Sequence, residues 1–74
     1  MAETMIRHRP FGRRLKAART VCDLSQVELS EKTEIPLSMI KQYERGRCLP
    51  RADRLHKIVS ALGITTDDLF EGAA

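Results

Sequence analysis

Start and stop signals for helices divide the middle of the chain into two short helices separated by a tight turn. Ser25 and Glu28 have the spacing of a capping box, in which each side chain bonds the backbone amide of the other residue at the start of a helix. Pro36 disfavours helical backbone at the residue before it, so this helix must end near Thr33 and a second helix must begin after the proline. Gly46 is a suitable left-handed stop for the second helix. The expected helices cover residues 26–33 and 37–45.

Apolar residues at helical spacing predict another helix before this pair. Phe11, Leu15 and Ala18 recur at i, i+4 and i+7. Pro10 suits the first turn of such a helix, because the amides of that turn have no backbone partner and proline has no N–H. The expected range of this helix is residues 10–20.

Two more helices are expected in the last third of the chain. The first carries an apolar stripe that Gly63 ends, and the members of the stripe are Ala52, Leu55, Ile58, Val59 and Leu62. Thr65 and Asp68 form a second capping box, which opens a short final helix. No segment has the alternating pattern of a strand. The expected fold is therefore all-α, a compact bundle of five short helices.

Composition excludes several classes of protein and of site. No apolar run approaches the ~18 residues of a membrane span, and the polar, basic start lacks the pattern of a secretory signal. We therefore expect a cytoplasmic protein with no membrane partner, in which Cys22 and Cys48 are free thiols. Together with His8 and His56 these cysteines lack the spacing of a metal site. The sequence contains no catalytic constellation, so we expect no enzyme activity, no catalytic residue and no cofactor.

Charge is unevenly distributed along the chain, although the net charge is only +3. Lys and Arg dominate residues 1–20 and 41–57, whereas acidic residues outnumber them in residues 21–40 and 58–74. The two basic segments could meet in space as one cationic face that attracts nucleic acid. Charge alone also allows a simpler interpretation, in which a solvated surface carries a chance cluster of basic residues.

The helix expected at residues 37–45 has an outward polar face near its N-terminus. Two helices joined by a three- or four-residue turn are typical of a helix-turn-helix, whose second helix enters the major groove of DNA. The outward positions are Leu37, Ser38, Lys41 and Gln42, while Ile40 and Tyr43 are expected in the core. Gln binds adenine through two hydrogen bonds, Lys reaches guanine, Ser bonds several bases, and an apolar side chain contacts the methyl group of thymine.

Four motifs follow one another between residues 11 and 70, namely FGRRLKAAR, LSQVELSEK, MIKQYERG and LHKIVSALGITTDDLF. In order and spacing they resemble the lambda repressor-like, or Xre-type, helix-turn-helix family. The resemblance implies a five-helix DNA-binding domain that acts as a homodimer on an inverted repeat. Its expected partner is double-stranded DNA.

The resemblance also assigns roles to residues outside the base-facing positions. Gln26, at the start of the first helix of the motif, matches a glutamine that contacts phosphate. Arg45 and Arg47 lie where the DNA backbone is approached. Arg19 and Glu44 match a structural ion pair that ties the first helix of the domain to the third.

Four positions in and around the turn depart from the family pattern. Glu34 stands where glycine is usual, which costs roughly 1 kcal/mol if the backbone there is left-handed. Pro36 replaces a Ser or Thr cap of the recognition helix. Leu37 replaces a polar base-reading residue, and Thr33 replaces an apolar one. The departures from the family pattern are therefore concentrated in and around the turn.

The two ends of the chain have their own expected roles. Residues 1–9 are expected to form a flexible basic arm, whose Arg7 and Arg9 either remain disordered or enter a DNA groove. The DNA-binding domain then covers residues 10–71, followed by a short tail at 72–74. Two copies are expected to pair through the C-terminal third of the chain, whose net charge is negative. The apolar residues of the expected contact are Leu62, Ile64, Leu69 and Phe70.

These observations predict a sequence-specific transcriptional regulator, most simply a repressor. It would bind an inverted-repeat operator as a homodimer, with residues 37–45 in the major groove. The alternative is a protein-interaction module of the same fold, such as an antitoxin or an anti-repressor. Leu37 and Met39 would suit that use, because apolar side chains at an exposed helix start favour a protein partner.

Overall fold

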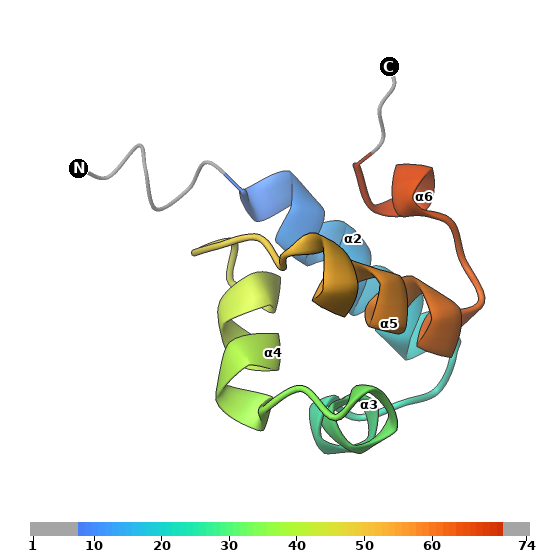
Figure 1. The fold of residues 1–74 in the computed structure, drawn as a ribbon. Coiled ribbons are helices and arrows are strands. Elements are labelled where there is room, and N and C mark those ends of the chain that lie inside the picture. The colour runs from blue at the N-terminus through green and yellow to red at the C-terminus, as the bar shows by residue number, and fades with distance from the viewer. Residues whose placement is uncertain (1–7, 71–74) are drawn as a thin grey trace.

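The computed structural model describes residues 8–70, which form five helices and no strand (Figure 1). With the labels of Figure 1, the helices are α2 (Arg9–Val21), α3 (Gln26–Thr33), α4 (Leu37–Glu44), α5 (Ala52–Leu62) and α6 (Thr66–Phe70). The predicted all-α fold is confirmed. The predicted helix ends differ from the observed ones by about one residue, which is within the usual fraying of helix ends.

The two predicted capping boxes are present and explain where α3 and α6 begin. At α3, the Glu28 amide donates to Ser25 Oγ over 3.0 Å, and the Ser25 amide donates to Glu28 Oε1 over 2.8 Å. At α6, the same reciprocal bonds join Thr65 and Asp68. In each box the side chains bond two amides at the start of the helix, and at α6 the Asp68 amide also donates to the Thr65 carbonyl over 3.1 Å.

Positive φ angles follow four of the helices, and Asp23 (φ 62°) is the residue with a positive φ after α2. Gly46 (φ 77°) comes after α4 and Gly63 (φ 67°) comes after α5, and glycine adopts this backbone without steric cost. Glu34 follows α3 with φ 62° although it has a side chain, so its conformation costs roughly 1–2 kcal/mol. The left-handed turn between α3 and α4 is thus present without the usual glycine.

A mostly aliphatic core joins the helices. α5 lies in front of α2 at the centre of Figure 1, with α3 below them and α4 to one side. The buried apolar side chains are Phe11, Leu15, Leu29, Ile35, Ile40, Tyr43, Ile58, Val59, Leu62 and Leu69. α4 packs against α2 and α3, while its other side is exposed at Ser38 and Lys41.

Candidate nucleic-acid interface

Side-chain hydrogen bonds fix the turn between α3 and α4. The Thr33 hydroxyl donates to the Leu29 carbonyl over 2.8 Å and accepts from the Ile35 amide over 3.3 Å. Ser30 Oγ donates to the Ile35 carbonyl over 2.6 Å. Thr33 is 2% exposed, so a bonded hydroxyl occupies a buried position that is usually apolar. These bonds lie on both sides of Glu34 and hold its strained backbone in place.

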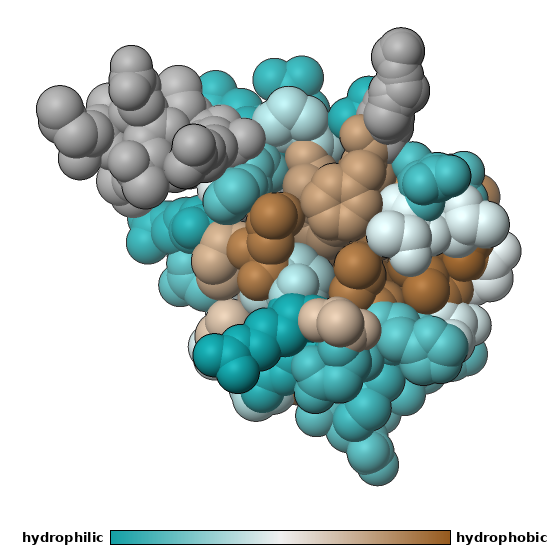
Figure 2. Space-filling model, turned by 45° about the horizontal axis from the view of Figure 1, so that its top comes forward, coloured by the Kyte–Doolittle hydropathy of each residue, from teal (hydrophilic) through white to brown (hydrophobic). Residues whose placement is uncertain are grey.

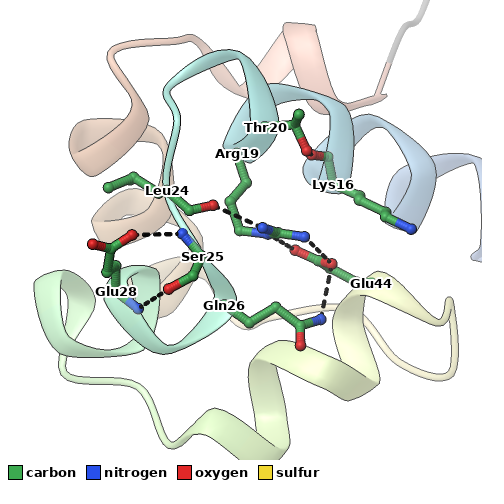
Figure 3. Close-up of polar contacts among 8 residues, drawn as sticks. All are labelled: Lys16, Arg19, Thr20, Leu24, Ser25, Gln26, Glu28 and Glu44. Carbon is green, nitrogen blue, oxygen red and sulfur yellow. Dashed lines mark hydrogen bonds and ion pairs between the residues drawn. The ribbon is translucent and has the colours of Figure 1, made fainter.

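The carboxylate of Glu44, the last residue of α4, joins three helices (Figure 3). Arg19 of α2 donates through Nε to Oε2 over 2.6 Å and through Nη2 to Oε1 over 3.1 Å. Gln26 of α3 donates through Nε2 to Oε1 over 3.0 Å. The Arg19 and Glu44 side chains are only 11% and 5% exposed, so water screens the pair weakly, and its two-point geometry fixes the orientation of α4.

Two glycines bring the backbone of α2 against the end of α4. A Cβ atom on Gly12 would lie 2.8 Å from the Tyr43 carbonyl oxygen and closer still to that of Glu44. A Cβ atom on Gly46 would lie 2.7 Å from Arg9 Cα. Since Cβ atoms are not accommodated at such distances, direct backbone contact sets the position of α4 against α2.

The outward face of α4 carries the four side chains that we predicted from the sequence to face DNA bases. Ser38 and Lys41 are exposed, and Leu37 and Gln42 are half-buried. On the opposite face Ile40 is fully buried in the core. The helix therefore presents a mixed hydrogen-bonding surface on a rigid support, which is the arrangement that recognition of base edges requires.

Polar and cationic side chains flank this surface at both ends. Gln26 is half-buried at the start of α3, and Arg45 and Arg47 are exposed in the segment that follows α4. Arg54 of α5 donates to the Tyr43 hydroxyl over 3.3 Å, and this hydrogen bond raises the pKa of Arg54. Sequence reasoning missed Arg54, because no local pattern signals a contact between side chains on two different helices.

Only part of the expected N-terminal arm falls within the described residues. Arg7 lies outside them. Arg9 is exposed in the first turn of α2, so it belongs to a helix rather than to an arm. Pro10 explains this early start, because its fixed φ and missing N–H suit the first helical turn.

The expected pairing surface needs correction. Leu62 and Leu69 are 5% and 0% exposed, so they belong to the core of a single chain and are not available to a second one. Ile64 is half-buried. Phe70 is 42% exposed, and its ring centroid lies 5.0 Å from that of Phe11. Leu69 is buried because α6 folds back onto α2, and Leu62 is buried at the end of α5.

The cysteines are free thiols, with Cys22 exposed and Cys48 half-buried. Within residues 8–70, no group of three or more His, Cys, Asp or Glu side chains is placed to hold a metal ion. No helix in this part of the chain combines the length and the apolar character needed to cross a membrane.

A sequence profile described as helix-turn-helix matches residues 15–69. The match includes the whole of α3, the turn, α4 and α5, together with Arg19 and the positions predicted to face DNA bases. The chain belongs to the lambda repressor-like helix-turn-helix family. Its membership confirms the resemblance that the motifs indicated, and it gives the α3–turn–α4 segment the helix-turn-helix arrangement of the family.

Several curated proteins of this family are similar to the chain. The immunity repressor protein of Bacillus phage phi105 is 40% identical over 53 residues, which is 72% of this chain and 37% of the phage protein. The cryptic phage CTXphi transcriptional repressor RstR of Vibrio cholerae is 36% identical over 56 residues, 76% of this chain and 50% of RstR. An uncharacterized HTH-type transcriptional regulator of Sinorhizobium medicae is 34% identical over 62 residues, 84% of this chain and 45% of that protein. The chain thus spans half or less of the length of these relatives.

Proposed function

We propose that the chain is a sequence-specific DNA-binding transcriptional regulator that acts as a repressor, with α4 as its recognition helix. The observation that carries the proposal is the outward face of α4, whose polar side chains stand on a helix fixed by Glu44 and by the Gly12 contact. Two of the similar proteins are named as repressors, which supports the sign of regulation.

Each side chain on the outward face of α4 has a base edge that it suits. Gln42 offers a donor and an acceptor to adenine, and Lys41 offers donors to guanine O6 and N7. Ser38 bonds either kind of group, and Leu37 contacts the methyl group of thymine. Pro36 caps α4 without a side-chain hydrogen bond, so the amides of Leu37 and Ser38 remain available to an acceptor on the DNA. The Met39 amide, in contrast, already donates to the Pro36 carbonyl.

Residues on both sides of α4 bind the phosphate backbone in this proposal. Arg45 and Arg47 are exposed cations close to the end of the recognition helix. Gln26 uses one amide hydrogen for Glu44, and the side-chain NH₂ group has a second hydrogen for a phosphate oxygen. A contact made by Gln26 would therefore couple the DNA backbone to the carboxylate that orients α4.

The proposed regulator binds as a homodimer. One recognition helix contacts only a few base pairs, so specific binding uses two copies whose recognition helices lie about 34 Å apart on an inverted repeat. The pairing surface is centred on Phe70 and Ile64, which remain at least partly accessible in the single chain. Figure 2, which brings the α6 side forward, shows apolar side chains gathered on this face, and Leu49 and Phe70 line one shallow hollow.

Selection of bound sites from a pool of random duplex DNA tests the proposal. We expect enrichment of an inverted repeat whose half-sites are centred about 10 base pairs apart. A reporter gene placed behind the enriched site should then be repressed when the protein is produced. If no sequence is enriched, and if binding to DNA does not depend on salt, the chain does not read DNA and the protein-interaction alternative replaces this proposal.

A further inference from the structure

One side of α2 carries a row of cations that the proposed interface leaves without a role. The row consists of Arg9, Arg13 and Lys16, all of which are exposed. None of the three forms an ion pair with a carboxylate of residues 8–70. α2 itself, with the sequence RPFGRRLKAARTV, contains no acidic residue that could neutralise them.

The row lies beside α4 and away from the core. Gly12 and Arg19 mark the side of α2 that touches α4, and they lie within about 20° of each other around the helix. Leu15, which is fully buried, lies about 60° to one side of this line. The three cations lie about 40–100° to the other side. In Figure 3, Lys16 and Arg19 leave α2 toward the side on which Glu44 lies.

The row works against the stability of α2. Arg9 and Arg13 are four residues apart, a spacing at which like charges on a helix repel each other. Arg9 also lies in the first turn, where the helix dipole disfavours a cation. A helix that only needed to be soluble would place acidic residues there. An anionic ligand along this side would remove both unfavourable effects.

We propose that Arg9, Arg13 and Lys16 bind the phosphates of one DNA strand beside the major groove that α4 enters. The row extends about 10 Å along α2, which is long enough to reach more than one phosphate of a single DNA strand. This inference rests on the proposed function and adds an anchor on α2 to those on α3 and after α4.

A pair of double variants with the same change of charge tests the inference. The first, Arg13→Gln with Lys16→Gln, removes two cations of the row. The control, Lys32→Gln with Lys57→Gln, removes two cations that line a shallow hollow between α3 and α5. Glutamine has a helix propensity close to those of Lys and Arg, so both variants should fold, as thermal unfolding followed by circular dichroism would verify. Affinity for random-sequence duplex DNA is then measured over a range of salt concentrations.

For DNA binding, log K falls as log salt rises. Loss of two phosphate contacts should make this slope less steep by about two units. It should also weaken binding roughly fiftyfold at ~0.1 M salt, whereas the control variant should keep a slope close to that of the unmodified chain. Equal slopes in the two double variants would overturn the assignment of the row while leaving DNA binding by α4 intact. If the unmodified chain shows no salt-dependent binding, the proposed function fails, and this inference fails with it.

Discussion

α4 and α6 are both short helices that pack against α2, but different kinds of contact hold them. α4 is held by the two-point ion pair between Arg19 and Glu44 and by the close approach of Gly12 to its carbonyl groups. α6 is held by the buried Leu69 and by the contact between the rings of Phe70 and Phe11. The first junction is polar and directional, and the second is apolar.

The difference corresponds to what each helix does in the proposed function. Hydrogen bonds and backbone contacts depend steeply on distance and angle, so they hold a helix in the narrow range of positions that base recognition needs. Apolar contact has no preferred direction. α6 can therefore close the core with Leu69 and still leave part of Phe70 accessible to another chain.

Glu44→Ala should break the polar junction and have the largest effect on stability. It leaves the guanidinium of Arg19, which is only 11% exposed, without its carboxylate. We expect the free energy of unfolding to fall by about 3 kcal/mol or more, measured by urea denaturation. Glu31→Ala, which removes an exposed carboxylate from α3, is the control and should change stability by less than ~0.5 kcal/mol. Similar losses in the two variants would contradict a special role for Glu44.

Gly12→Ala tests the backbone contact of the same junction. The new methyl group would push against the carbonyl groups at the end of α4, and such overpacking typically costs about 1–3 kcal/mol. It should also shift α4 and weaken binding to the selected operator. Gly63→Ala is the matched control, because its Cβ would meet nothing within 4 Å and only the positive φ of 67° opposes it. Gly63→Ala should therefore lower stability by about 1 kcal/mol and leave DNA affinity unchanged.

Phe70→Ala addresses the apolar junction. Because the side chain is 42% exposed, we expect a loss of only about 1–2 kcal/mol in the stability of the single chain, less than for a fully buried phenylalanine. Sedimentation at micromolar concentration should show dimers of the unmodified chain and mainly monomers of the variant. Val27→Ala, which alters a 49% exposed apolar side chain on α3, should leave the dimer intact. If both variants remain dimeric, the pairing surface lies elsewhere.

Glu34→Gly should raise the stability of the domain slightly, unlike the three changes at the α4 and α6 junctions. Position 34 has φ 62°, and glycine adopts this backbone without the strain that a Cβ atom brings. We expect the free energy of unfolding to rise by about 1 kcal/mol, visible as a higher Tm. A lower Tm would show that the turn, held by the bonds of Thr33 and Ser30, carries no strain for glycine to relieve.

Local signals predicted the frame of the domain. The capping box of Ser25 and Glu28 and the stop at Gly63 act within a few residues, so they can be recognised without knowledge of the tertiary fold. Contacts between helices are different. The juxtaposition of Arg19 and Glu44 was suggested by the family resemblance, whereas the bond from Gln26 to the same carboxylate depends on how α3 meets α4 and has no local signature.

Burial near the C-terminus was the least predictable feature. Leu69 and Phe70 are neighbouring apolar residues, and their spacing does not say which of them faces the core. The direction in which α6 folds back onto α2 decides that Leu69 is buried and that Phe70 is partly exposed. A helix of only five residues is too short for its apolar pattern to indicate this direction.

The most direct test of the account compares Gln42→Ala with Arg47→Ala on the selected operator and on random-sequence DNA over a range of salt concentrations. We expect Gln42→Ala to lose about 1–3 kcal/mol on the operator alone, with relaxed preference at one base pair, because it removes a contact to a base edge. Arg47→Ala should weaken binding to both DNAs alike and lower the salt slope by about one unit, because it removes a contact to phosphate. Equal losses by both variants on both DNAs would contradict the claim that α4 reads the sequence.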